Sequence, residues 1–471
     1  MTLNWHYISQ ILILIYFIAI NGSYTLLIFL AFFEVRHQYN HSFIEDYPDL
    51  YKSKLAPGLS YLVPAYNEEA TIAESAKSYL KTKYSKYEVI VINDGSTDNT
   101  LQVLKDEFKL KKVYRAMNTR VKTKKVKGFY ISQTNPNLFV IDKYNGGSKA
   151  DALNAGINAA RHPYFICVDA DVIMDKSAML RIMRPMLEDP AHNMAAGGIV
   201  RIVNDSIVED GQIKEVKLSK NPIVAFQVVE YIRAFTAGRA GFQRLKTLLI
   251  VSGAFGVFNT EVVRKIGGYQ RKTLGEDMEL LVRLHRHLRE TIGSKYNIIY
   301  RTYPVCWTEA PETLKVLGSQ RNRWHRGLSD VLLRHKKMIF NPRYGRIGMF
   351  GMPFFLFIEF LGPIIEFFGY FYVIYMILFG VMQWEFFFLF LALAMLWGIW
   401  MTVTAILFED LNFKWYKHWY QIAALIFFAL VESFGYRQLT LIWRIQGLFD
   451  YLRGQHTWTA TQRKGFKTSN T

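Results

Sequence analysis

The stretch YNGGSKADALNAGINAARHPYFICVDADVIM, residues 144–174, decides the fold of this chain. A glycine turn and a lysine lead into a helix, which we expect from Lys149 to Ala160. An apolar strand follows and stops at Asp169-Ala170-Asp171. The hydrophobic core behind the strand cannot satisfy two carboxylates. We therefore expect a group outside the strand end, most simply a metal ion, to meet them.

The sequence before this stretch alternates strands with helices in the same way. Leu59–Ala70 indicates a strand, a turn at Pro64 and a helix running to about Leu80. Val89–Ile92 forms a second apolar strand, and NLFVID, residues 137–142, a further one. Such alternation predicts a mostly parallel sheet with helices on both faces, an α/β fold.

Polar residues follow three of these strands. They are Tyr66, Asp94 and the pair Asp169 and Asp171. Ligands of α/β sheets bind at the carboxyl ends of the strands, so we expect these side chains to share one site. Hard oxygen ligands favour Mg²⁺ or Mn²⁺, which bridge to substrate phosphates. Each motif alone also fits a solvated loop or a helix cap.

Composition limits the classes of partner. The chain has 471 residues, is 51% hydrophobic and carries a formal net charge of +18. Its length favours more than one structural unit. The positive charge suits nucleic acid, anionic lipid or a phosphorylated substrate. Two cysteines, Cys167 and Cys306, imply no disulfide framework, and we interpret both as packing residues.

The apolar residues gather into runs long enough to cross a bilayer, which needs about 20 residues. The runs are Ile11–Phe33, Gly348–Gly380, Phe386–Phe408 and Gln421–Trp443. They predict an integral membrane protein. Basic residues follow the first run and none precedes it, which places the amino terminus outside and the polar domain in the cytoplasm.

Charged residues interrupt these runs at Glu359, Glu366 and Glu432. Carboxylates at membrane depth are costly, so we expect each to face a cavity or a partner. Pro363 either breaks the second run into two short segments or kinks it, and the sequence leaves both open.

Seven motifs in order now point to a family. They are VPAYNEE (63–69), NDGSTD (93–98), GGSKADALNAG (146–156), DAD (169–171), SGAFGVF (252–258), GEDMEL (275–280) and QRNRW (320–324). Together they resemble the membrane-embedded family 2 glycosyltransferases with the GT-A fold, the branch of cellulose, hyaluronan, chitin-oligosaccharide and poly-N-acetylglucosamine synthases.

The resemblance implies a role for each strand-end residue. Tyr66, Glu68 and Asp94 would hold the uridine of a UDP-sugar. Lys149 would face the diphosphate or the base. Asp169 would contact the nucleotide, and Asp169 with Asp171 would bind Mg²⁺ or Mn²⁺. A metal ion and a cationic side chain there would stabilise the charge of the leaving diphosphate.

Glu276 and Asp277 begin an amphipathic helix, where acids are favourable for the helix dipole alone. The resemblance implies that Glu276 and Asp277 are catalytic residues. Asp277 would be the general base of an inverting displacement. Gly275 stands where the family has threonine. We expect this change to leave the carboxylates intact and to alter how the acceptor is held.

Gln320, Arg323 and Trp324 share one helical face. A basic interfacial helix is the alternative. The resemblance implies that Arg323 meets the diphosphate and that Trp324, with Gln320, binds the acceptor sugar. In the tail, Trp458 and Arg463 faintly resemble a gating loop that closes over bound nucleotide; a disordered basic tail is the alternative.

These inferences combine into one hypothesis. A transmembrane helix (1–35) precedes a cytoplasmic GT-A domain with interfacial helices (55–345), transmembrane or interfacial helices (346–443) and a basic tail (444–471). The protein is predicted to be a multi-pass plasma-membrane enzyme, metal-dependent, inverting and processive, using UDP-N-acetylglucosamine or UDP-glucose. Its partners are the growing glycan and the bilayer, with accessory export proteins left open and no nucleic acid.

The alternative function is a non-processive transferase that adds one sugar to a lipid carrier or glycolipid. A transporter or scaffold with a degenerate nucleotide-binding domain is a different class. The intact carboxylates and the QRNRW motif argue against it.

Overall fold

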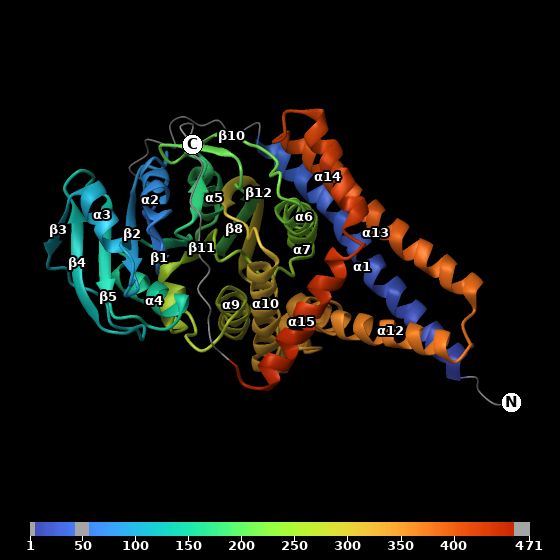
Figure 1. Cartoon of the computed structure of the whole chain (residues 1–471). Coiled ribbons are helices and arrows are strands. Elements are labelled where there is room, and N and C mark those ends of the chain that lie inside the picture. Colours follow the sequence, from blue (N-terminus) through green and yellow to red (C-terminus); the bar gives the residue numbers. More distant parts are fainter. Residues whose placement is uncertain (1–4, 43–55, 456–471) are drawn as a thin grey trace.

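The computed structural model describes residues 5–42 and 56–455, and Figure 1 shows its arrangement. A ten-stranded sheet has the order β3-β4-β5-β2-β1-β6-β11-β8-β12-β7. Its strands are β1 Leu59–Ala65, β2 Tyr87–Asn93, β3 Leu110–Val113, β4 Val126–Ser132, β5 Leu138–Lys143, β6 Tyr164–Cys167, β7 Val172–Met174, β8 Asn193–Ile202, β11 Gly256–Asn259 and β12 Asn297–Thr308. A separate hairpin pairs β9 Ile207–Glu209 with β10 Gln212–Glu215.

The centre of the sheet is parallel, as the alternating pattern predicts. β5, β2, β1 and β6 are neighbours and all run in one direction. The predicted mostly parallel sheet is nevertheless mixed, because β4 and β11 enter antiparallel on either side of this centre. Short local connections let β4 precede β5 directly, and a parallel pair would need a longer crossover.

Pro64 lies inside β1 and does not begin a turn. It continues the register with β2 opposite Ile92, whereas the pairing with β6 ends at Leu62. A proline cannot donate to a ladder, so it is tolerated where one side of the strand has no partner. The strand therefore extends one residue beyond the proline and delivers Tyr66 to the rim.

Helices cover the sheet (Figure 1). They are α2 Ile72–Leu80, α3 Thr100–Phe108, α4 Lys149–Ala159, α5 Ala178–Glu188 and α8 Thr260–Lys265. Two further helices, α9 Glu276–Ile292 and α10 Leu314–Arg334, pack against each other. Helices α6 Pro222–Tyr231, η2 Ile232–Arg239 and α7 Ala240–Leu245 join the domain to the apolar helices. Short helical turns η3 Lys336–Met338 and η4 Pro342–Tyr344 follow α10.

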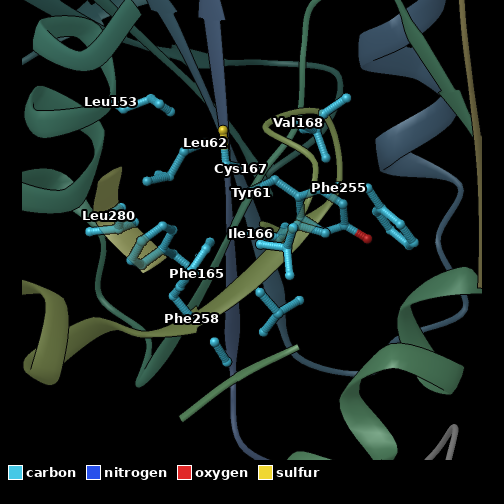
Figure 2. Packing of buried hydrophobic residues seen from close by; sticks show 14 of the residues in the cluster. Tyr61, Leu62, Leu153, Phe165, Ile166, Cys167, Val168, Phe255, Phe258 and Leu280 are labelled. Carbon is cyan, nitrogen blue, oxygen red and sulfur yellow. The ribbon is translucent and has the colours of Figure 1, made fainter. Parts of the chain in front are cut away.

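The core lies where the central strands meet α4, α9 and β11 (Figure 2). Phe165 and Phe258 stack with ring centroids 5.5 Å apart, and both are buried. The two cysteines are buried and free, which agrees with their packing role. Burial raises the pKa of the Cys167 thiol to about 12, so this thiol stays protonated at neutral pH.

Within residues 5–42 and 56–455, three helices are long and apolar enough to cross a membrane, or four if a bent pair counts as one span. They are α1 Trp5–Ser42, the continuous helical run 347–378 and α13 Trp384–Phe413. The run 347–378 comprises η5 Ile347–Gly351, α11 Met352–Phe354, η6 Phe355–Phe360 and α12 Leu361–Leu378. The bent pair is α14 Trp419–Val431 and α15 Tyr436–Leu452, which meet at 60°.

Pro363 does not break the second apolar run. The run 347–378 passes through it, and the π-helical segment η6 ends at Phe360, three residues before the proline. The fourth apolar run, Gln421–Trp443, is divided instead, because α14 ends at Val431 and α15 begins after Gly435 at φ 94°.

The carboxylates inside the apolar runs have arginine partners. Arg444 contacts Glu359 at 3.4 Å, and Arg437 contacts Glu366 at 3.7 Å. Arg233 donates to Glu432. Pairing reduces the cost of placing a carboxylate in an apolar environment. Of the two expectations, a cavity or a partner, each of these carboxylates meets the second.

Candidate functional site

The central strands bring three predicted residues to one rim of the sheet. Tyr66, Asp94 and Asp169 follow β1, β2 and β6, and β1 lies between the other two. All three strands run in the same direction, so their carboxyl ends meet. This rim, together with the first turn of α9 and one face of α10, is the candidate site.

Asp94 belongs to a buried charge cluster. Lys143 donates to its carboxylate, and the Gly146 amide donates to Oδ1 at 3.1 Å. The same lysine lies 2.8 Å from Asp151 Oδ2, and neither Lys143 nor Asp151 exposes its side chain. Burial raises the pKa of Asp94, while Lys143 acts in the opposite direction. Lys143 therefore fixes the position of Asp94 at the strand end.

Sequence reasoning missed Lys143 and Asp151. Asp151 lies within the GGSKADALNAG motif, so its place in the motif was a signal. Lys143 ends β5 and carried no signal of its own, because a lysine after a strand usually points to solvent.

Glu68 has a local environment. Its carboxylate accepts a hydrogen bond from the Thr71 hydroxyl at 3.0 Å, and its backbone N–H donates to Thr100 Oγ1 at 2.8 Å. These contacts tie the β1–α2 turn to the start of α3. Glu68 is half-buried and lies two residues after Tyr66 in the sequence. Its assignment to uridine stays a prediction.

A chain of contacts links the strand end to α9. Lys149 pairs with Asp169 and donates to the Gly253 carbonyl at 3.0 Å. The Gly253 amide in turn approaches Asp277 Oδ2 at 3.3 Å. Gly253 thus joins the cation at the predicted diphosphate position to the predicted general base. It was visible in sequence only as part of the SGAFGVF motif.

Glycine suits this position because the space is narrow. A Cβ on Gly253 would lie 3.2 Å from Lys149 Nζ and 3.5 Å from Asp277 Oδ2. Burial alone would lower the pKa of Lys149, yet the Asp169 and Glu276 carboxylates hold it above its ordinary value. Lys149 is therefore a cation under all physiological conditions.

Glu276 and Asp277 begin α9 as expected, and their environments differ. Burial and the neighbouring Asp277 charge raise the pKa of Glu276, while Lys149 and Arg323 act in the opposite direction. Asp277 Oδ1 accepts from the Met278 amide at 2.8 Å, which orients the carboxylate.

The glycine at position 275 is explained by helix packing. A Cβ built on Gly275 would lie 3.1 Å from the Gly327 backbone, and one on Gly327 would lie 2.9 Å from the Gly275 backbone. The start of α9 and the middle of α10 therefore touch through two glycines. A threonine at 275 would require the α10 backbone at Gly327 to move away.

Asp171 is almost fully buried, at 1% exposure, and accepts a hydrogen bond from Thr308 Oγ1 at 3.1 Å. Within residues 5–42 and 56–455, no three His, Cys, Asp or Glu side chains form a group that would hold a metal ion. Mg²⁺ is often bound by one or two carboxylates and substrate phosphates. Asp169 and Asp171 fit that kind of site, in which the nucleotide supplies the remaining oxygens.

The α10 face carries the last predicted residues. Trp324 is 44% exposed, and the guanidinium of Arg321 lies 4.3 Å from its ring centroid. Arg321 also pairs with Glu230 of α6, whose Oε2 accepts from the Tyr436 hydroxyl at 3.0 Å. Arg321, Glu230 and Tyr436 were not predicted, since they come from three separate helices.

Gln320 is half-buried on the same helix, and its Oε1 has no hydrogen-bond partner in the described part of the chain. The two gating candidates, Trp458 and Arg463, lie outside the described residues.

Comparison with known proteins identifies the family and the fold of the chain. A family model described as glycosyl transferase family 2 matches residues 60–267, and one described as glycosyl transferase family group 2 matches residues 164–428. A poly-beta-1,6-N-acetyl-D-glucosamine synthase from Staphylococcus aureus strain COL is 31% identical over 301 residues, 64% of this chain and 60% of the relative. The synthase of the same name from Staphylococcus epidermidis is 28% identical over 277 residues, 59% of this chain and 56% of the relative.

The match therefore spans about 60% of the length of these curated relatives. Among solved structures, a mannosyltransferase from Pyrobaculum calidifontis in complex with GDP-Man and Mn²⁺ is similar, with a TM-score of 0.51. It is 16% identical, and the superposition covers 93% of this chain and 99% of that one. At this identity the likeness concerns the fold alone, and together with the family models it confirms the predicted GT-A fold.

Proposed function

The chain belongs to the family 2 glycosyltransferases, and on this premise we propose that it is an inverting β-glycosyltransferase that extends a polysaccharide from a UDP-sugar. One observation carries the proposal. Lys149 contacts both Asp169 and Gly253, and Gly253 contacts Asp277. One chain of contacts therefore links Lys149, which is predicted to face the leaving diphosphate, to Asp277, the predicted base.

The proposed reaction is a single displacement. The acceptor hydroxyl oxygen forms a bond to the anomeric carbon of the donor, and its proton passes to the Asp277 carboxylate. The bond between that carbon and the UDP oxygen breaks, and its electron pair leaves with the diphosphate. Lys149 and Arg323 stabilise the charge that develops on the diphosphate. Attack from the face opposite UDP converts an α-linked donor into a β linkage.

Donor binding uses the rim of the sheet. Tyr66, Glu68 and Asp94 are proposed to hold the uridine, with Lys143 orienting Asp94. Asp169 and Asp171 would hold Mg²⁺ or Mn²⁺, which would supply positive charge next to the diphosphate. Buried Asp171 is oriented for this by Thr308.

The acceptor is proposed to bind at α10. The exposed Trp324 ring offers a surface on which a sugar can stack, and Gln320 contributes an unpaired amide oxygen nearby in the helix. UDP-N-acetylglucosamine is favoured over UDP-glucose as donor by the names of the curated relatives. The same names and the Gln-x-x-Arg-Trp sequence favour a processive synthase over a transferase that adds one sugar to a lipid.

We propose a multi-pass topology from the directions of the helices. Ser9 contacts Tyr372 and Tyr24 contacts Glu359, so α12 runs antiparallel to α1. Trp397 donates to Thr25, and Phe32 lies against Phe408.

These contacts make α13 parallel to α1. With the amino terminus outside, α1 leads into a cytoplasmic catalytic domain, α12 crosses outward and α13 returns. The proposed domain limits are 1–35, 55–345, 346–443 and 444–471.

The test is a donor panel assayed by UDP release, with sizing of the product. We expect turnover with UDP-N-acetylglucosamine and a long β-linked product. Asp277→Asn should lower turnover by about 10²–10⁴, the usual contribution of a general base, while UDP affinity stays the same. Glu290→Gln, at the far end of α9, is the matched control and should keep full activity. Equal loss of UDP affinity and turnover in Asp277→Asn would refute its role as base.

A further inference from the structure

A pocket lies away from the candidate site, where the catalytic domain meets the end of α13. Its volume is about 300 Å³. Strands β7, β10 and β12 form one wall, and the α13–α14 connection forms the other. Figure 1 shows β10 and this connection at the same end of the molecule. The lining residues include Lys214, Trp307, Phe413, Lys414, Trp415 and Lys417.

The pocket has unbalanced positive charge. Its two acidic residues are paired, since Glu215 lies 3.1 Å from Lys217 and Asp175 lies 3.7 Å from Arg181. Lys214, Lys414 and Lys417 make no ion pair within residues 5–42 and 56–455. Three exposed ammonium groups around one hollow attract an anion.

A hydrogen-bond donor in the wall is also unpaired. Trp415 Nε1 is buried and has no acceptor among the described residues. The indole is held edge-on against Trp307, with ring centroids 5.4 Å apart. A buried donor without a partner is costly, and an oxygen-rich ligand would relieve that cost.

The position of the pocket identifies the anion. Phe413 is the last residue of α13, an apolar helix that runs parallel to α1 and so ends on the side of the catalytic domain. Lys414 turns the chain in the left-handed conformation, with φ 48°. Aromatic and basic residues at such a helix end lie at the level of the lipid headgroups.

We propose that this pocket binds the phosphate headgroup of an anionic phospholipid from the leaflet that faces the catalytic domain. The lysines hold the phosphate, the Trp415 N–H donates to one of its oxygens, and the acyl chains lie along the apolar surface that ends at Phe413. This inference rests on the helix directions and on the pocket, and it is independent of the glycosyl transfer.

The test is native mass spectrometry of the purified full-length protein in detergent, with added phosphatidylglycerol or phosphatidylcholine. We expect retention of phosphatidylglycerol but not of phosphatidylcholine. The triple variant Lys214→Gln, Lys414→Gln, Lys417→Gln should bind phosphatidylglycerol roughly 100-fold more weakly, as the loss of three basic residues near a lipid surface implies.

A matched control removes three other exposed lysines, at Lys111, Lys112 and Lys265, and should retain the lipid. UDP binding by the pocket variant reports its folding and should be unchanged. Equal retention by the pocket variant and the native protein would overturn the proposal. Displacement of the lipid by millimolar glycerol phosphate would also overturn it, because the ligand would then be a soluble phosphate.

Discussion

Replacing Gly327 with alanine tests the contact between α9 and α10, because the contact decides whether the substitution raises or lowers the stability of the folded protein. Gly327 lies in the interior of α10, where alanine is ordinarily more stable than glycine by about 1 kcal/mol. The close approach predicts the opposite. A Cβ at 327 would lie 2.9 Å from the Gly275 N and Cα atoms, and backbone atoms cannot rotate away.

The magnitude follows from these two effects. Overpacking typically costs about 1–3 kcal/mol, and a backbone contact belongs in the upper part of that range. After the gain in helix propensity, Gly327→Ala should destabilise the protein by about 1–2 kcal/mol. The unfolding entropy grows with chain length, so for a chain of 471 residues the apparent Tm should fall by about 1–2 °C. Turnover should fall as well, because Gly275 directly precedes Glu276 and Asp277.

The assay is thermal unfolding of the purified protein in detergent, followed by UDP release at saturating donor. Gly369→Ala is the matched control, since this α12 glycine has no atom within 4 Å of a built Cβ. We expect the control to be neutral or slightly stabilised. A stabilised Gly327→Ala with full turnover would refute the helix contact and the explanation of glycine at 275.

Asp171→Asn should give a folded, membrane-inserted protein that releases no UDP at any Mg²⁺ or Mn²⁺ concentration; normal release would rule out the metal assignment. Glu230→Gln should free Arg321 from its ion pair and raise the KM for acceptor roughly 3- to 10-fold, the equivalent of a cation–π contact, with kcat nearly unchanged. A change in kcat alone would exclude this positioning role. Glu88→Gln should destabilise the protein by about 3 kcal/mol or more, because buried Arg115 loses its partner at 2.9 Å. Burial would raise the pKa of Glu88, but hydrogen bonds from the Arg161 amide, Arg115 and Ser60 outweigh it and lower the pKa. The stability that this carboxylate contributes is therefore present above its unfolded pKa, about 4.3, and is lost as the pH falls through the lower folded value. Unfolding measured against pH should show this acid-side loss in the native protein, and an identical curve for Glu88→Gln would contradict it.

Local patterns in the sequence determined the central part of the fold and the position of the candidate site. Apolar strands followed by helices predicted β1, β2, β5, β6 and α4. Because the carboxyl ends of parallel strands meet, the same pattern predicted that Tyr66, Asp94 and Asp169 share a rim. The apolar runs predicted the membrane helices for an equally local reason, their length and composition.

The tertiary structure decided which residues meet across long stretches of chain. Lys149 reaches Gly253, 104 residues away, and Arg233 reaches Glu432, 199 residues away. No periodicity or spacing encodes such pairs, since they depend on how whole helices dock. The same holds for the antiparallel entry of β4 and β11 and for the two glycines at which α9 touches α10. Residue types and local order are therefore readable from the sequence, whereas the partners of buried charges and the spacing between helices exist only once the chain has packed.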